Sequence, residues 1–340
     1  MTVSTALPST NALADAAQVA HRISAHVKQS VLGRDDVIEQ CVMALLADGH
    51  VLVEDLPGSG KTTLAKSIGD AIIDDRPADQ RGHIEAFRRI QFTPDLLPSD
   101  ITGTTVFEPA MGTFSFKPGP LFAHVVLADE INRTSPKVQS AMLEAMAEKQ
   151  ITVDNRTHPL DSLFFVIATQ NPLDLAGTFP LPVAQLDRFL FKIRMTAIGR
   201  EAELNVLRTI HQRRVPAGAG VVTRSQVLAA RQVMEQQVAV HVLLHEALVD
   251  LAQALRTDPR VLQGVSTRAL VLAVPALQAR ALMQGRDYVS ADDLEAVIPL
   301  VFAHRLELGG GTAETNAVIR DALRPSLERL ARATLQRISA

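Results

Sequence analysis

Five short and almost continuously apolar runs stand out along the first part of the chain, separated by segments of helical or loop character. Such runs lack the polar–apolar alternation of a half-exposed strand, which favours strands buried on both faces of a parallel sheet. Because strands alternate with helices, the pattern predicts an α/β fold with a doubly wound, five-stranded parallel sheet. The expected strands cover residues 51–53, 89–92, 125–129, 163–168 and 189–193.

Two segments do not fit this alternation. Residues 104–117 (TTVFEPAMGTFSFK) are typical of two strands around a Pro/Gly turn. Residues 150–160 (QITVDNRTHPL) predict a second hairpin, with its turn near Asp154 and Asn155. We expect both hairpins to be insertions that protrude from the α/β core.

After about Met195 the pattern becomes helical and the strand signals vanish. Ser290 with Asp293, three residues later, has the spacing of a helix-start box, and so does Thr223 with Gln226. Leucines recur on single helical faces, as at 244, 248, 251 and 255. We therefore expect an N-terminal tail and first helix over residues 1–24, an α/β core over 25–197, and an α-helical lid with C-terminal helices over 198–340.

Composition narrows the classes of partner. Lys plus Arg number 34 against 37 Asp plus Glu, and aromatic residues make up 4% of the chain. Neither a basic field nor a supply of stacking rings is present, so nucleic acid is an unlikely partner. No apolar stretch reaches the length of about 18 residues that a membrane span needs. The N-terminus does not resemble a secretory signal, and the single cysteine, Cys41, fits a cytoplasmic protein.

The strongest chemical signal is DLPGSGKTT at residues 55–63, which follows an expected strand and precedes an expected helix. In a P-loop, glycines let consecutive backbone N–H groups face the phosphates of ATP. Lys61 would reach the β- and γ-phosphates, and the Thr62 hydroxyl would ligate Mg²⁺. Asp55 replaces the first glycine of the usual pattern, at a position that turns the chain and does not contact phosphate. The expected nucleotide-binding residues are Pro57, Gly58, Ser59, Gly60, Lys61, Thr62 and Thr63.

A second motif, VVLADE at residues 125–130, is an apolar strand that ends in two carboxylates. Such acids are costly at the end of a buried strand unless they serve a cation or a water molecule. Beside a P-loop, Asp129 would hold Mg²⁺, and Glu130 would polarise the attacking water as general base.

Three further motifs follow in order: ATQNP, which carries Asn171; LPVAQLDRF, which carries Arg188; and GVSTR, which carries Arg268. With these motifs the sequence resembles the AAA+ ATPases, and within them the MoxR family closely, over roughly residues 25–305. The resemblance implies that Asn171 is the sensor-1 residue that helps to orient water. It implies that Arg188 is an arginine finger acting on the neighbouring subunit's ATP, with Arg133 as the competing candidate. Arg268 would be the sensor-2 arginine, reaching the γ-phosphate from the lid.

The resemblance also implies how the protein assembles. Leu32 and Gly33 occupy the positions where the family packs adenine, and the two hairpins match inserts that face the central pore of a ring. A homo-oligomeric ring, expected to be a hexamer, would remodel or mature client protein complexes with partners that carry von Willebrand factor A-type domains. Two alternatives share the same core: a motor linked to nucleic acid, which the charge and aromatic content disfavour, and a slow switch that binds partners according to its ATP state.

Overall fold

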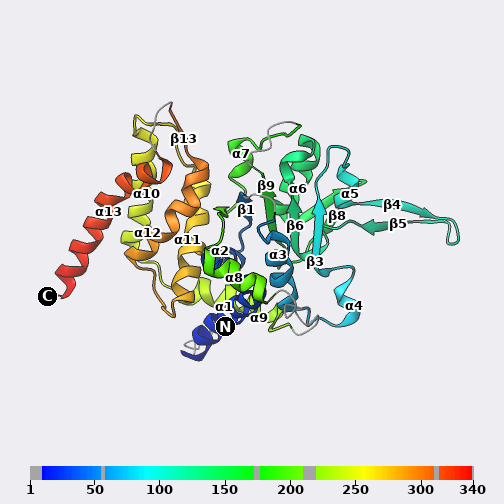
Figure 1. The fold of residues 1–340 in the computed structure, drawn as a ribbon, viewed down its shortest axis with the longest axis horizontal. Coiled ribbons are helices and arrows are strands. Elements are labelled where there is room, and N and C mark those ends of the chain that lie inside the picture. Colours follow the sequence, from blue (N-terminus) through cyan, green and yellow to red (C-terminus); the bar gives the residue numbers. More distant parts are fainter. Residues whose placement is uncertain (1–9, 55–57, 172–176, 210–219, 310–313, 339–340) are drawn as a thin grey trace, which may run out of the picture. The chain divides into compact units, whose positions relative to one another are not determined.

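The computed structural model describes residues 10–54, 58–171, 177–209, 220–309 and 314–338. The chain forms two compact units, each of which is described by itself. One unit spans Arg22–Ser225, and the other joins Gln226–Ala340 with the residues up to His21. Figure 1 shows the sheet of the first unit and the helices of the second.

A five-stranded parallel sheet organises the first unit, as the apolar runs predict. The strand order is β10-β1-β9-β6-β3, so β9 is central and β3 lies at one edge. In β6, alternate residues belong to one buried cluster, while the residues between them are also fully buried and point to the other face. This double burial explains the continuous apolar runs. The strands are β1 (Val51–Glu54), β3 (Glu85–Gln91), β6 (Ala123–Asp129), β9 (Phe165–Gln170) and β10 (Phe191–Arg194).

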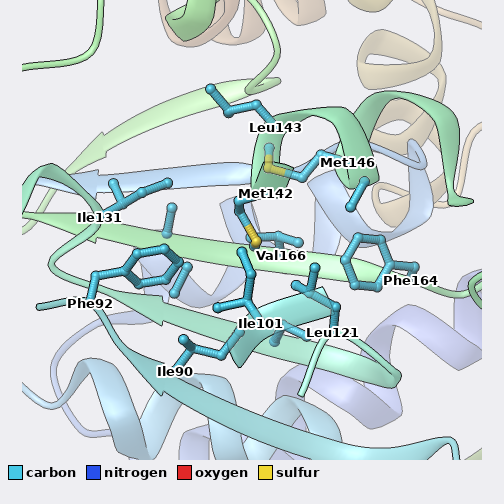
Figure 2. Close-up of a cluster of buried hydrophobic side chains, with 14 of the residues drawn as sticks. Ile90, Phe92, Ile101, Leu121, Ile131, Met142, Leu143, Met146, Phe164 and Val166 are labelled. Carbon is cyan, nitrogen blue, oxygen red and sulfur yellow. The ribbon is translucent and has the colours of Figure 1, made fainter. Parts of the chain in front are cut away.

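Helix α6 (Pro136–Glu148) packs its apolar side on the sheet and closes a core cluster of buried residues. Met142, Met146 and Phe164 meet there, above Val166 of the central strand (Figure 2). Helix α3 (Lys61–Asp70) contacts β3 and β6. The other longer helices of this unit are α2 (Asp35–Leu46) and α8 (Arg200–Arg208).

Both predicted hairpins are confirmed. Strands β4 (Gly103–Glu108) and β5 (Thr113–Pro118) pair antiparallel and extend away from the sheet (Figure 1). Strands β7 (Gln150–Val153) and β8 (Arg156–Pro159) pair around a two-residue turn. The turn residues, Asp154 and Asn155, both have positive φ, which is the conformation that such a hairpin requires. The hairpins touch each other, because the Phe116 ring stacks on the His158 ring with centroids 3.8 Å apart.

Short elements complete this unit. Strand β2 pairs in parallel with β11, which comes much later in the chain, just before α9. These pieces are too short to leave a periodic pattern in the sequence. They are β2 (Ile72–Ile73), α4 (Ala78–Arg81), α5 (Pro98–Thr102), η1 (Ile131–Arg133), α7 (Val183–Leu186) and β11 (Val222–Thr223).

A buried ionic cluster ties distant segments of this unit together. Arg76 and Arg224 approach the Asp161 carboxylate at 2.9 and 2.8 Å, and the His124 Nε2 atom lies 3.7 Å from it. Burial by itself raises the pKa of Asp161, but the nearby His124 ring and the hydrogen bonds from the Leu163 backbone N–H and from Arg224 outweigh it and hold that pKa well below its usual range. Arg76 also pairs with Asp74, whose pKa is lowered mainly by that contact.

The second unit is mainly helical. The expected face of α10 is buried at Leu244, Leu248, Leu251 and Leu255, and Ser290 and Asp293 form the predicted capping box. The expectation that no strand follows residue 195 is wrong, because three strands of two or three residues occur there, among them β11. The elements are α1 (Thr10–Ser30), α9 (Arg224–Gln237), α10 (Val242–Thr257), β12 (Val261–Gln263), α11 (Thr267–Met283), α12 (Ala291–Phe302), η2 (Ala303–Arg305), β13 (Glu307–Leu308) and α13 (Thr315–Ile338).

Across the described residues, no helix combines the length and the apolar character that crossing a membrane would take.

Candidate active site

The glycine-rich loop leads directly into α3. Gly58 and Gly60 both adopt positive φ, at 88° and 97°, and Gly60 is the residue before the first helical turn. Among the described residues, no atom lies within 4 Å of the position that a Cβ would take at either glycine, so the positive φ is the described reason for glycine here. Lys61 begins α3 and is half-buried, while Thr62 and Thr63 are exposed in the same turn. Asp55 to Pro57 lie outside the described residues.

The two acids of the second motif stand at the carboxyl end of β6. Asp129 is its last residue, and Glu130 follows in the left-handed region with φ 58°. Thr169 of the central strand β9 connects them: its hydroxyl donates to Asp129 Oδ1 at 2.7 Å and accepts from the Glu130 N–H at 2.9 Å. The Thr169 hydroxyl therefore fixes the Asp129 carboxylate directly and holds Glu130 through its backbone N–H.

Each carboxylate also has a cationic partner. Arg89 of β3 donates to Asp129 Oδ2 from Nη2 at 2.6 Å, and Arg133 Nε lies 3.2 Å from Glu130 Oε2. Gln91, two residues beyond Arg89 on the same face of β3, donates to Glu130 Oε2 at 2.8 Å and accepts from Arg89 at 2.7 Å. The result is a continuous chain of contacts from Asp129 through β3 to Glu130.

Asn171 comes directly after β9 and so stands at the same sheet edge as the two acids. Arg188 lies between α7 and β10, and its Nη1 atom donates to the Leu143 carbonyl of α6 at 2.8 Å. Arg268 is the second residue of α11, exposed, and belongs to the helical unit. Within the described part of the first unit, the structure therefore gathers the P-loop, Asp129, Glu130 and Asn171 at one edge, and holds Arg188 on α6.

A cavity of about 620 Å³ opens beside the P-loop. Gly58 to Gly60 and Thr63 line it together with apolar residues such as Leu32, Ile198 and Leu207. At Gly33 an added Cβ would lie only 2.6 Å from the Ala202 Cβ, so this loop fits tightly against α8. A glycine turn at a helix N-terminus, an adjacent lysine and an apolar wall suit a nucleoside triphosphate in size and chemistry.

Comparison with known proteins agrees with this geometry. Residues 50–191 match the family described as "ATPase family associated with various cellular activities (AAA)", and residues 253–325 match an AAA lid domain. Chaperone MoxR1 of Mycobacterium tuberculosis is 37% identical over 300 residues, covering 83% of this chain and 74% of that protein. The chain belongs to the MoxR family of AAA+ ATPases. The uncharacterized protein YeaC of Bacillus subtilis is 43% identical over 288 residues, covering 83% of this chain and 85% of its own.

A solved structure of a protein from Cytophaga hutchinsonii, described as an ATPase, shares the MoxR-type fold with a TM-score of 0.82 and 34% identity. The alignment covers 92% of this chain and 96% of that one. The predicted family, the α/β AAA+ fold and the ATPase activity are therefore confirmed. The sequence analysis missed Arg89, Gln91 and Thr169 as partners of the acids in this MoxR-family site. A polar Thr169 at the end of a buried strand was the one available signal among them.

Proposed function

We propose that this ATPase hydrolyses ATP with Mg²⁺ through Lys61, Thr62, Asp129 and Glu130, and that it works as a ring that remodels or matures client protein complexes. The observation that carries the chemistry is the Thr169 bridge. It holds the Asp129 carboxylate and the Glu130 backbone at the carboxyl edge of the sheet, where the P-loop also leaves β1.

The proposed roles follow from the charge and position of each group. Lys61 neutralises β- and γ-phosphate charge at the N-terminus of α3, where the helix dipole adds positive potential. Thr62 and Asp129 offer the oxygen ligands that Mg²⁺ prefers, and the bound ion would neutralise further phosphate charge. Glu130 polarises the attacking water, and Asn171 orients it.

Ring formation rests on the need for a trans arginine. Arg133 is already paired with Glu130 of its own subunit, whereas Arg188 donates, among the described residues, to a neutral carbonyl of α6. A guanidinium that is bound to a neutral acceptor loses less interaction energy when it turns toward a neighbour's phosphates than one that is bound to a carboxylate. We therefore rank Arg188 first. The hexameric state and the sensor-2 role of Arg268 stay predictions.

The client side of the proposal is supported by the name of one relative, Chaperone MoxR1, and by the projecting β4–β5 hairpin. Partners with von Willebrand factor A-type domains follow only from the resemblance in sequence. We place the work of the protein in the cytoplasm, where its single cysteine, buried in α2, would stay reduced.

A slow ATP-state switch is the second candidate, because Gln91 and Arg133 hold Glu130 and Arg89 holds Asp129. The steady-state rate of hydrolysis separates the two. A rate raised by added nucleic acid would instead favour a motor linked to nucleic acid.

The central test compares Glu130→Gln with Lys61→Ala in calorimetric titrations and hydrolysis assays. Glu130→Gln should bind Mg·ATP normally and hydrolyse it about 10²–10⁴-fold more slowly, as for a lost general base. Lys61→Ala should lose ATP binding, because only neutral backbone dipoles would remain to face the phosphates. Normal ATP affinity in Lys61→Ala would contradict the assignment, and the bind-without-hydrolysis behaviour in Asp129→Asn alone would reverse the roles of the acids.

Assembly is tested by mixing two inactive variants. Arg188→Ala and Glu130→Gln should each hydrolyse ATP poorly, with a finger worth about 10³–10⁵ in rate. Mixed rings contain interfaces that pair an intact Glu130 with an intact Arg188, so the mixture should regain activity at concentrations where rings form. The same mixture kept monomeric is the control. No recovery in confirmed mixed rings would move the trans role to Arg133.

A further inference from the structure

One arginine of the cavity beside the P-loop lacks a described counter-charge. The Arg34 side chain lines that cavity, its residue is 6% exposed, and its Nε atom has no hydrogen-bond partner. Ser30 also lines this cavity and is 7% exposed, and its hydroxyl is likewise without a hydrogen-bond partner among the described residues. Glu203 is an exposed acid of this cavity, but within the described ranges no ion pair joins it to Arg34.

Such groups are unusual inside a protein. A buried charge without a partner is strongly destabilising, and buried polar atoms nearly always find hydrogen bonds. Arg305 gives the contrast in this same chain: it is 2% exposed, and its guanidinium contacts the Val301 carbonyl and the His304 ring. We therefore expect a bound molecule to supply the missing hydrogen bonds of Arg34 and Ser30.

Their position selects the part of the nucleotide that they would meet. Phosphates belong at the P-loop glycines and the start of α3, which line part of this cavity. Arg34 directly follows Gly33, which fits against Ala202 of α8, and the wall around it is apolar at Leu32 and Ile198. An apolar wall with a few polar groups is what a purine ring requires.

We propose that Arg34 and Ser30 recognise the adenine base. The Arg34 Nε–H group donates to a ring nitrogen of the base, and the Ser30 hydroxyl accepts from the exocyclic amino group. The inference rests on the proposed placement of ATP in this cavity, and it adds two specificity-determining residues to Leu32 and Gly33.

The test measures binding and not hydrolysis, using the full chain and calorimetric titration with Mg·ATP and its 1-deaza, 3-deaza and 7-deaza analogues. Each analogue replaces one ring nitrogen by C–H. One of the three should bind the wild type roughly 10–100-fold more weakly than ATP, the size expected for a hydrogen bond to a charged donor. In Arg34→Met, which keeps the apolar stem, ATP and that analogue should bind equally.

Ser30 has a matched arm. A triphosphate of unsubstituted purine riboside, which lacks the amino group, should bind the wild type several-fold more weakly than ATP, and this difference should disappear in Ser30→Ala. Arg200→Met is the control for charge, because Arg200 is an exposed residue of α8 that pairs with Glu201 and does not line the cavity. It should leave all of these affinities unchanged.

The outcomes separate cleanly. If all three deaza analogues bind the wild type like ATP, or if the deficit persists in Arg34→Met, base recognition by Arg34 is wrong. If Arg34→Met weakens ATP, every analogue and inorganic tripolyphosphate by one factor, the contact is with phosphate and the proposal is overturned. If the wild-type protein binds no ATP, the proposed function itself is contradicted. Should Arg34→Met not fold, Arg34→Lys moves the donor while keeping the charge, and the analogue deficit should shrink there too.

Discussion

Two sets of carboxylates in the α/β unit face arginines, and they differ in how deeply those arginines are buried. Asp129 and Glu130 are held by Arg89 and Arg133, whose side chains are 47% and 41% exposed. Asp161 is 1% exposed, and its partners Arg224 and Arg76 are 14% and 20% exposed. The contacts look alike in geometry, but only the second set is shielded from water.

The difference decides which contacts can be exchanged. Ion pairs with an exposed partner contribute about 0–1 kcal/mol, whereas removing one member of a buried pair costs about 3–5 kcal/mol. The acids at the sheet edge can therefore leave their arginines at little cost when a nucleotide arrives. The Asp161 cluster cannot, and it fixes the segments that it joins.

Breaking the buried cluster should have the largest effect. Asp161→Asn removes the carboxylate that Arg76 and Arg224 share and leaves Arg76 with Asp74 alone, so we expect the free energy of unfolding to fall by about 3 kcal/mol or more. Urea unfolding at neutral pH, followed by circular dichroism, measures it. Asp129→Asn is the matched control at a pair whose arginine is exposed and stays solvated, and it should change stability by less than about 1 kcal/mol. Equal losses of stability in the two variants would contradict the distinction between buried and exposed arginine partners.

Lowering the pH should weaken the same Asp161 cluster in the wild-type protein. The pKa of Asp161 is lower in the folded state than in the unfolded chain, so its contribution is fully present above the unfolded value of about 4 and is lost as the pH falls below it. Urea midpoints from pH 7 to pH 3 should therefore fall more steeply for the wild type than for Asp161→Asn. Parallel curves would mean that Asp161 titrates alike in both states.

At Asp129 and Glu130, Gln91→Ala should have a smaller effect, and it should raise activity where Asp161→Asn lowers stability. Removing the donor that holds Glu130 frees the general base, so kcat should rise by up to about fivefold, the equivalent of one net hydrogen bond. Stability should not change measurably. A tenfold fall in kcat would show that Gln91 itself serves the reaction.

The smallest expected effect concerns Mg²⁺. Arg89 places a guanidinium on the carboxylate that would serve the ion, so Arg89→Met should lower the Mg²⁺ concentration needed for half-maximal ATP binding by about two- to fivefold. Fluorescence titration of a labelled ATP analogue at several Mg²⁺ concentrations measures this without turnover. Arg88→Met on the same strand is the control, because Arg88 pairs with Glu85 and not with a site acid. An unchanged requirement in Arg89→Met would show that the two cations do not compete.

The sequence predicted those features that depend on local pattern. Continuous apolar runs such as the one in β6 identify a strand buried on both faces, and Asp154 with Asn155 identifies a hairpin turn. The P-loop context also depends on neighbours in the chain, with a strand before Gly58 and a helix from Lys61. In each case one short window contains the physical cause.

Contacts between residues far apart in the sequence could not be predicted from a local pattern. Arg89 meets Asp129 from 40 residues away, and Arg224 meets Asp161 from 63 residues away. An arginine on an edge strand has the same local sequence whether it faces water or a carboxylate, so only the sheet order reveals the contact. The two-residue strands β2 and β11 were missed for the same reason, since their pairing and not their composition defines them.

Strand β3 has one more consequence, which concerns solubility. It is the last strand of the sheet, so one row of its backbone N–H and C=O groups has no partner strand, and such edges can pair with other chains. Glu85, Arg88, Arg89 and Gln91 make this edge polar, and charged side chains discourage edge-to-edge aggregation. Arg89 and Gln91, which restrain the site acids, therefore also protect the open edge. Replacing Arg88 and Arg89 together by valine should make the protein aggregate under conditions in which it is still folded.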